Sequence, residues 1–121
     1  MSVLVIHGEP REIRLTAADI DVAERMIVKN DGRAIMDVLG NHNALFTKAE
    51  LEWLLWGAWR GKLTAGAIQK LMGEFYGNGG TLYDVQAAVL EALIDSGLYG
   101  KRRANEEETA ADPTTGRERA D

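Results

Sequence analysis

The segment 51–60 (Leu-Glu-Trp-Leu-Leu-Trp-Gly-Ala-Trp-Arg) restricts the fold of this chain more than any other. At about 100° per residue, its aliphatic side chains fall on one side of a helix, as a core stripe does. They are Leu51, Leu54, Leu55 and Ala58. The three tryptophans lie elsewhere, with Trp53 and Trp56 close to the opposite side and Trp59 at the edge of the stripe. Because such a helix is apolar almost all the way round, we expect it either to lie at the centre of a domain or to turn its second face to a partner.

The tryptophans of this helix are the candidate partner-binding residues. An indole supplies a large contact area with few rotamers, which is why tryptophan is enriched at binding hot spots. A second apolar face that contains Trp53 and Trp56 would suit a partner groove or a self-association surface, so a homo-oligomer is also possible. The predicted partner-binding site is Trp53, Trp56, Trp59 and Arg60.

The rest of the chain predicts a mainly α fold. Two short runs of β-branched or alternating residues within 3–15, separated by Gly8-Glu9-Pro10, indicate a small N-terminal β-hairpin. Apolar residues at helical spacing then predict a bundle of four to five short helices, at about residues 17–29, 33–39, 48–60, 65–76 and 82–96.

Threonines mark the starts of four of these helices. Three of them are followed three residues later by a carboxylate, as a capping box requires, and the fourth lacks this partner. The pairs are Thr16 with Asp19, Thr47 with Glu50 and Thr81 with Asp84, while Thr64 stands without one.

One folded domain is expected over residues 1–100 of the 121-residue chain. Residues 101–121 contain no Val, Ile, Leu, Met or aromatic residue and carry clustered charges. Burial cannot offset the entropy of ordering such a segment, so we expect a disordered charged tail there.

The expected location is the cytoplasm. Cysteine is absent, which removes disulfides and thiol chemistry and fits a reducing compartment. No run of 18 apolar residues occurs, so no membrane-spanning helix is expected. Residues 1–7 lack the basic start of a signal peptide.

No catalytic, cofactor-binding or metal-binding set is expected. His7 and His42 are isolated, and the chain has no phosphate-binding glycine motif. The carboxylates, Glu50 and Glu52 among them, are expected at helix caps or on solvated faces. A net charge of -5, from 14 Lys and Arg against 19 Asp and Glu, argues against nucleic acid as the main partner. We expect a protein without enzymatic activity.

The order of these features resembles a family of small phage proteins. An alternating Arg-x-Ile-Arg-Leu strand leads into a threonine-capped helix, and residues 51–61 give Leu-x-x-Leu-Leu-x-Gly-Ala-Trp-Arg-Gly. Helices after Thr64 and Thr81 and a charged tail follow. Over about residues 3–98 this layout resembles the small tail-assembly proteins, or tail assembly chaperones, of siphophages and gene transfer agents.

The resemblance implies a role in phage tail morphogenesis in the host bacterial cytoplasm. It implies a chaperone that binds the tape measure protein, or another tail protein, through an apolar helix surface. A structural tail component is one alternative. The residues alone also leave open a helix-turn-helix DNA-associated regulator, built from residues 51–60 and 65–76, and a toxin-antitoxin or adaptor module.

Overall fold

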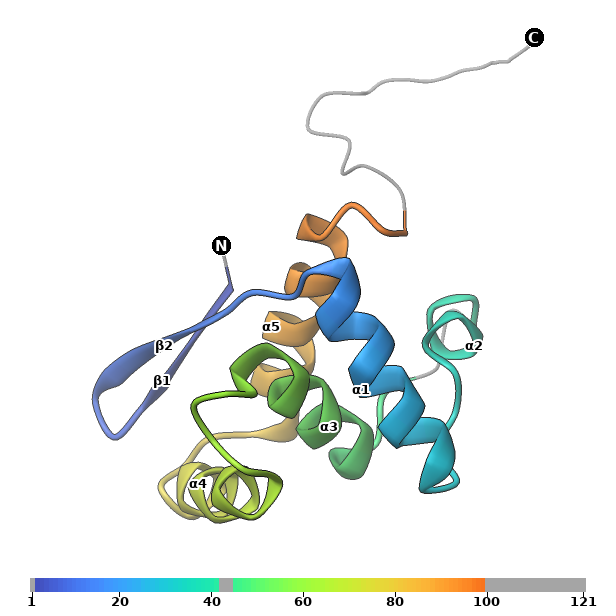
Figure 1. The fold of residues 1–121 in the computed structure, drawn as a ribbon. Helices are drawn as coiled ribbons and strands as arrows, with labels where there is room; N and C mark the ends of the chain where they lie inside the picture. Colours follow the sequence, from blue (N-terminus) through green and yellow to red (C-terminus); the bar gives the residue numbers. More distant parts are fainter. Residues whose placement is uncertain (1, 42–44, 100–121) are drawn as a thin grey trace, which may run out of the picture.

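The computed structural model describes residues 2–41 and 45–99. In this part of the chain, a two-stranded antiparallel hairpin is followed by five helices, which confirms the predicted mainly α fold (Figure 1). The strands are β1 (Ser2–Ile6) and β2 (Glu9–Ile13). The helices are α1 (Ala17–Lys29), α2 (Ile35–Leu39), α3 (Lys48–Trp59), α4 (Ala65–Gly77) and α5 (Leu82–Asp95). The predicted tail lies outside the described residues.

The predicted threonine caps begin four of the helices. The hydroxyl groups of Thr16, Thr47 and Thr81 each accept a hydrogen bond from the backbone N–H three residues on, and the carboxylate there accepts one from the threonine N–H. Thr64 caps α4 through its hydroxyl alone. These bonds satisfy N–H groups that have no partner within the helix, and they fix where each helix begins.

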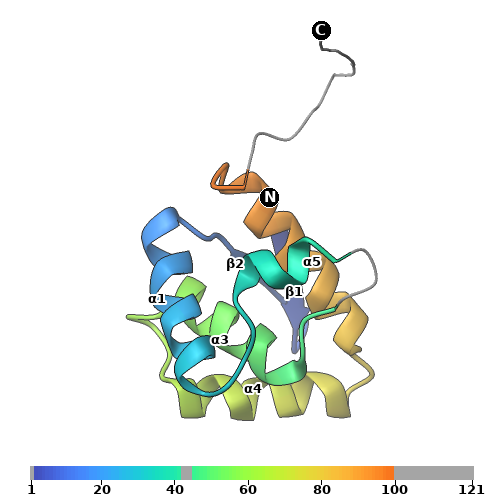
Figure 2. The ribbon, with the colours of Figure 1, turned by 90° about the vertical axis from the view of Figure 1, so that its right-hand side faces the viewer.

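Helix α3 is the central helix of the domain. It packs against α1, α4, α5 and β2, and its leucines Leu51, Leu54 and Leu55 are fully buried. In both views α4 lies along the lower edge of the domain beneath α3 (Figure 1, Figure 2). The hairpin projects to the left in Figure 1. Helix α3 therefore lies at the centre of the domain, as predicted, and a partner on its second face stays a prediction.

Gly57 allows α1 and α3 to approach closely. A Cβ at this position would lie 2.9 Å from the carbonyl oxygen of Asp19 and 3.0 Å from the Cβ of Ala23, both on α1. Such distances are too short for ordinary packing. A side chain at Gly57 would therefore push α1 away from the central helix.

The hairpin turn begins one residue earlier than predicted and is shorter by one residue. His7 and Gly8 form it, with φ values of 55° and 76°, as a type I′ turn requires. Glu9 and Pro10, expected in the break, belong to β2, and Pro10 pairs with Val5. The register directs Leu4 and Ile6 into the core, so the hairpin is stabilised by the helices beneath it.

Helix α2 begins two residues later than predicted. Ala34 precedes it in an extended conformation, with φ −59° and ψ 147°. The backbone N–H of Arg33 donates to the Glu50 carboxylate at 2.8 Å, which holds this segment outside the helix. No helix in the described part of the chain is long and apolar enough to cross a membrane.

Two glycine substitutions test the close packing of α1 and α3. We expect Gly57→Ala to lower the free energy of unfolding by about 1–3 kcal/mol, because the added methyl group forces the helices apart. Gly73→Ala is the matched control: a Cβ at Gly73 in α4 meets nothing within 4 Å. It should raise stability by about 0.5–1 kcal/mol through helix propensity. Urea unfolding followed by circular dichroism measures both, and equal effects of the two would contradict this packing.

Candidate partner-binding surface

Trp59, one of the four predicted partner-binding residues, belongs to the core. Its side chain is buried, and its indole Nε1–H donates to the backbone carbonyl of Glu12 in β2 at 2.8 Å. The ring therefore joins α3 to the hairpin. Because it is enclosed by the protein's own elements, Trp59 does not contribute to an open surface, and the prediction is corrected for this residue.

Trp53 and Trp56 lie together on the side of α3 that its neighbours cover least. Both are half-buried, and their rings make an edge-to-face contact with centroids 5.5 Å apart. Ala49 and Arg60, which are exposed, continue the same face of the helix at spacings of three and four residues. We call Ala49, Trp53, Trp56 and Arg60 the tryptophan seam.

Hollows flank Trp53 on both sides. One, of about 310 Å³, separates it from the end of α1 and the connection to α2. Its lining includes Ile27, Asn30, Gly32 and Arg33. A smaller one, of about 40 Å³, lies between Trp53 and the start of α4, at Ala65 and Gln69. The larger hollow has room for an apolar side chain of a partner, with an indole as one wall.

Arg60 closes one end of the seam through an ion pair. Its guanidinium donates to one carboxylate oxygen of Asp19, from Nε at 3.2 Å and from Nη2 at 3.0 Å. Burial alone would raise the pKa of Asp19, but hydrogen bonds from Thr16 and Arg60 outweigh it and hold the pKa below its ordinary value. The pair fixes the end of α3 against the start of α1, and the Arg60 side chain remains partly exposed.

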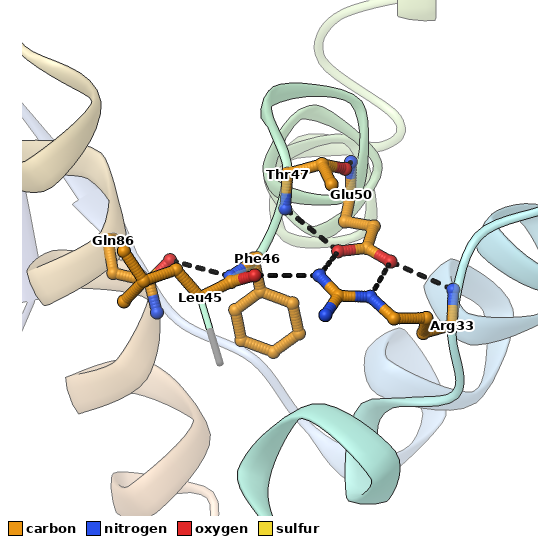
Figure 3. A network of polar contacts seen from close by, with 6 residues as sticks. All are labelled: Arg33, Leu45, Phe46, Thr47, Glu50 and Gln86. Atoms are coloured by element: carbon orange, nitrogen blue, oxygen red, sulfur yellow. Dashed lines mark hydrogen bonds and ion pairs between the residues drawn. The ribbon is translucent and has the colours of Figure 1, made fainter. Parts of the chain in front are cut away.

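Arg33 and Glu50 form the wall of the larger hollow. Glu50 is almost fully buried, and its carboxylate accepts hydrogen bonds from Arg33 Nη2 at 2.7 Å, Arg33 N at 2.8 Å and Thr47 N at 2.8 Å (Figure 3). The Arg33 guanidinium also donates to the carbonyl of Leu45 at 2.6 Å. The next residue, Phe46, donates its N–H to Gln86 of α5 at 3.1 Å. One network thus links the connections on both sides of α2 to α3 and α5.

The ionised form of Glu50 is strongly favoured. Burial by itself would raise the pKa of its carboxyl, but the hydrogen bonds and charge of Arg33 and the Thr47 N–H lower it to about 2. The sequence identified Glu50 as the capping partner of Thr47, which the structure confirms, but it did not predict that this carboxylate is buried and paired with Arg33. Arg33 lies 17 residues away, and no local pattern in the sequence indicates this pairing.

Glu52 also departs from the expectation of a solvated carboxylate. It is buried and accepts a hydrogen bond from Lys48 Nζ at 2.6 Å. The Lys48 ammonium lies 5.9 Å from the centroid of the Tyr76 ring on α4, within range of a cation–π contact. Burial raises the pKa of the Tyr76 hydroxyl, and the Glu52 charge raises it further. These three side chains join α3 to the end of α4.

The described residues contain no group of three metal-ligating side chains. His7 lies in the exposed hairpin turn, where its Nε2 is 2.7 Å from the Glu74 carboxylate. His42 lies outside the described residues. No protein-family model, curated protein or solved structure matches the chain.

The pH dependence of stability tests the Arg33–Glu50 network. The pKa of Glu50 is about 2 in the folded chain against an ordinary 4.5, so its stabilisation is present above pH 4.5 and is lost as the pH falls towards 2. We expect Glu50→Gln to lower the free energy of unfolding at pH 7 by about 2–3 kcal/mol. Below pH 4.5 the difference in free energy of unfolding between the variant and the wild type should become smaller.

The matched control for this test is Asp21→Asn. Asp21 also pairs with an arginine, Arg25, at 2.8 Å, but both side chains are more than half exposed. Its removal should change stability by less than about 0.5 kcal/mol. The free energy of unfolding of the wild type and both variants is measured by chemical unfolding between pH 2 and 7. If the difference between Glu50→Gln and the wild type did not change with pH, the stabilising role of the ionised Glu50 would be contradicted.

Proposed function

We propose that this chain is a non-enzymatic phage tail morphogenesis protein, an assembly chaperone that binds the tape measure protein through the tryptophan seam. The observation that carries the proposal is the position of Trp53 and Trp56 on the central helix. Both indoles pack against the core on one side and keep part of their area open on the other. Paired aromatics with a hollow beside them are a common form of binding hot spot.

An amphipathic helix is the partner structure that suits this surface. A helix presents apolar side chains at intervals of three and four residues, the spacing at which the seam residues themselves recur. The hollow of about 310 Å³ beside Trp53 would take one anchoring side chain. A tape measure protein, as a long helical chain that must stay unaggregated before assembly, would offer many such segments.

The exposed face of α4 does not favour the alternative function, a helix-turn-helix regulator that binds DNA. A recognition helix needs side chains that hydrogen-bond to base edges and cations for phosphates. The exposed residues within α4 are Gly66, Gln69, Lys70, Gly73, Glu74 and Gly77. Three glycines and one lysine opposed by a glutamate give this helix little means of reading DNA.

Co-expression with the tape measure protein of the same phage tests the proposal. We expect the tape measure protein to stay in the soluble fraction only when this chain is present, and to be captured with it. Trp53→Ala combined with Trp56→Ala should reduce the captured amount about ten-fold or more, because hot-spot tryptophans contribute 2 kcal/mol or more each.

The control variant is Met36→Ala, which truncates a side chain that is 58% exposed on α2, away from the seam. It should leave capture unchanged. Thermal unfolding of each variant separates loss of binding from loss of fold. A folded double variant that still solubilises the tape measure protein would contradict the proposal, and tubes or rings formed by this chain alone would favour the structural tail component.

A further inference from the structure

The ion pairs around the tryptophan seam are balanced, each cation with one carboxylate. They are Arg33 with Glu50, Lys48 with Glu52 and Arg60 with Asp19, with N–O distances of 2.7, 2.6 and 3.0 Å. At such distances the two charges of a pair largely cancel for a third group further away. Any charge that the seam offers to a partner must therefore come from a group outside these pairs.

Asp31 is such a group. It lines the hollow of about 310 Å³ beside Trp53, and it is exposed. In the described part of the chain, no hydrogen bond or ion pair reaches its carboxylate. The other charged residues that line this hollow, Arg33 and Glu50, neutralise each other. The hollow beside Trp53 therefore carries a net negative charge.

The end of α1 determines the position of Asp31. The N–H of Asn30 donates to the carbonyls of Met26 and Ile27, and that of Asp31 donates to Val28 at 3.1 Å. Asp31 then leaves the helix with φ 67°, a left-handed conformation that aspartate and asparagine tolerate better than most residues. Because the C-terminal end of a helix carries partial negative charge, the end of α1 adds to the preference of this hollow for a cation.

An apolar path leads to the Asp31 carboxylate. Ile27, Ala49 and the half-buried ring of Trp53 line the same hollow. A lysine or arginine side chain has an apolar stem and a cationic head, and it commonly packs the stem on apolar surface while the head stays near water. An indole is also the aromatic ring that attracts a cation most strongly. The lining thus matches both parts of a basic side chain.

We infer that this hollow takes a lysine or arginine side chain of a helical partner, with its stem against Trp53 and its cationic head at the Asp31 carboxylate. The inference rests on the proposed function, because it names the chemistry of the partner residue that binds beside the seam. The net charge of -5 favours the same partner, since an acidic chain attracts a basic helix. Apolar side chains three or four residues along that helix would contact Trp56.

Binding of synthetic peptides to the full chain, measured by isothermal titration calorimetry, tests this inference. The peptides overlap and cover the helical segments of the tape measure protein of the same phage. We expect the segment that binds most tightly to contain a lysine or arginine with apolar residues at helical spacing. Replacing that residue by norleucine, which keeps an aliphatic stem and lacks the charge, should raise the Kd about five-fold.

Asp31→Asn removes the charge on the other side of the contact. It should also raise the Kd about five-fold, and asparagine keeps the left-handed backbone. Asp37→Asn is the matched control: Asp37 on α2 is exposed and lines neither hollow, and its loss changes the net charge equally. It should leave the Kd unchanged, and circular dichroism should show both variants folded.

Combining the two changes tests the contact itself. Norleucine should weaken binding to Asp31→Asn much less than it weakens binding to the wild type, because the carboxylate that pairs with the cation is already gone. Equal weakening of both proteins would overturn the inference, and so would an Asp37→Asn protein weakened as much as Asp31→Asn.

The peptide series separates this inference from the proposed function. If the tightest segment contained no lysine or arginine, the inference would be overturned while the proposed function stood. If no segment bound, both would be overturned. Sedimentation of the chain alone covers a further occupant: self-association that Asp31→Asn weakens would assign the hollow to a basic side chain of a second copy and overturn the inference.

Discussion

The enclosure of an almost wholly apolar helix is the constraint on which the rest of this structure depends. Burial of α3 removes its leucines from water, the dominant favourable term in folding, and three helices and a strand supply the enclosure. Gly57 lets α1 come close on one side. On another side of α3, Trp59 packs against the hairpin and donates its indole N–H to the carbonyl of Glu12. This contact stabilises the hairpin, because two strands alone are only marginally stable in water.

An ion pair holds each end of α3 against a neighbouring segment. Arg60 with Asp19 fixes the end of α3 against the start of α1, and Arg33 with Glu50 fixes its start against the connection to α2. Helix α4 packs on α3 from another direction. Between these fixed positions a strip of the central helix stays partly open, and Trp53 and Trp56 occupy it. The candidate binding surface is therefore a consequence of the way in which the core is closed.

The sequence predicted what local spacing determines. The threonine caps, four helix starts and the wrapped helix follow from residues three to eight positions apart, and the structure has them. Features set by distant contacts were not predictable in the same way. Trp59 lay at the edge of the core stripe, and only the position of β2 shows that it is buried. The hairpin turn at His7-Gly8 places a non-glycine residue at positive φ, which the sequence Gly8-Glu9-Pro10 did not indicate, and the register of the two strands follows from this turn.

The three tryptophans of α3 divide into one core residue, Trp59, and two surface residues, Trp53 and Trp56, and their indole N–H resonances test this division directly. The chain is labelled with ¹⁵N-tryptophan, assigned by single Trp→Phe substitutions, and titrated with a helical segment of the tape measure protein. We expect the Trp59 resonance to exchange slowly with solvent and to stay in place, because its N–H is bonded to Glu12, while those of Trp53 and Trp56 shift together. A shift confined to Trp59, or no shift at Trp53 and Trp56 on binding, would contradict the assignment of the tryptophan seam as the partner surface.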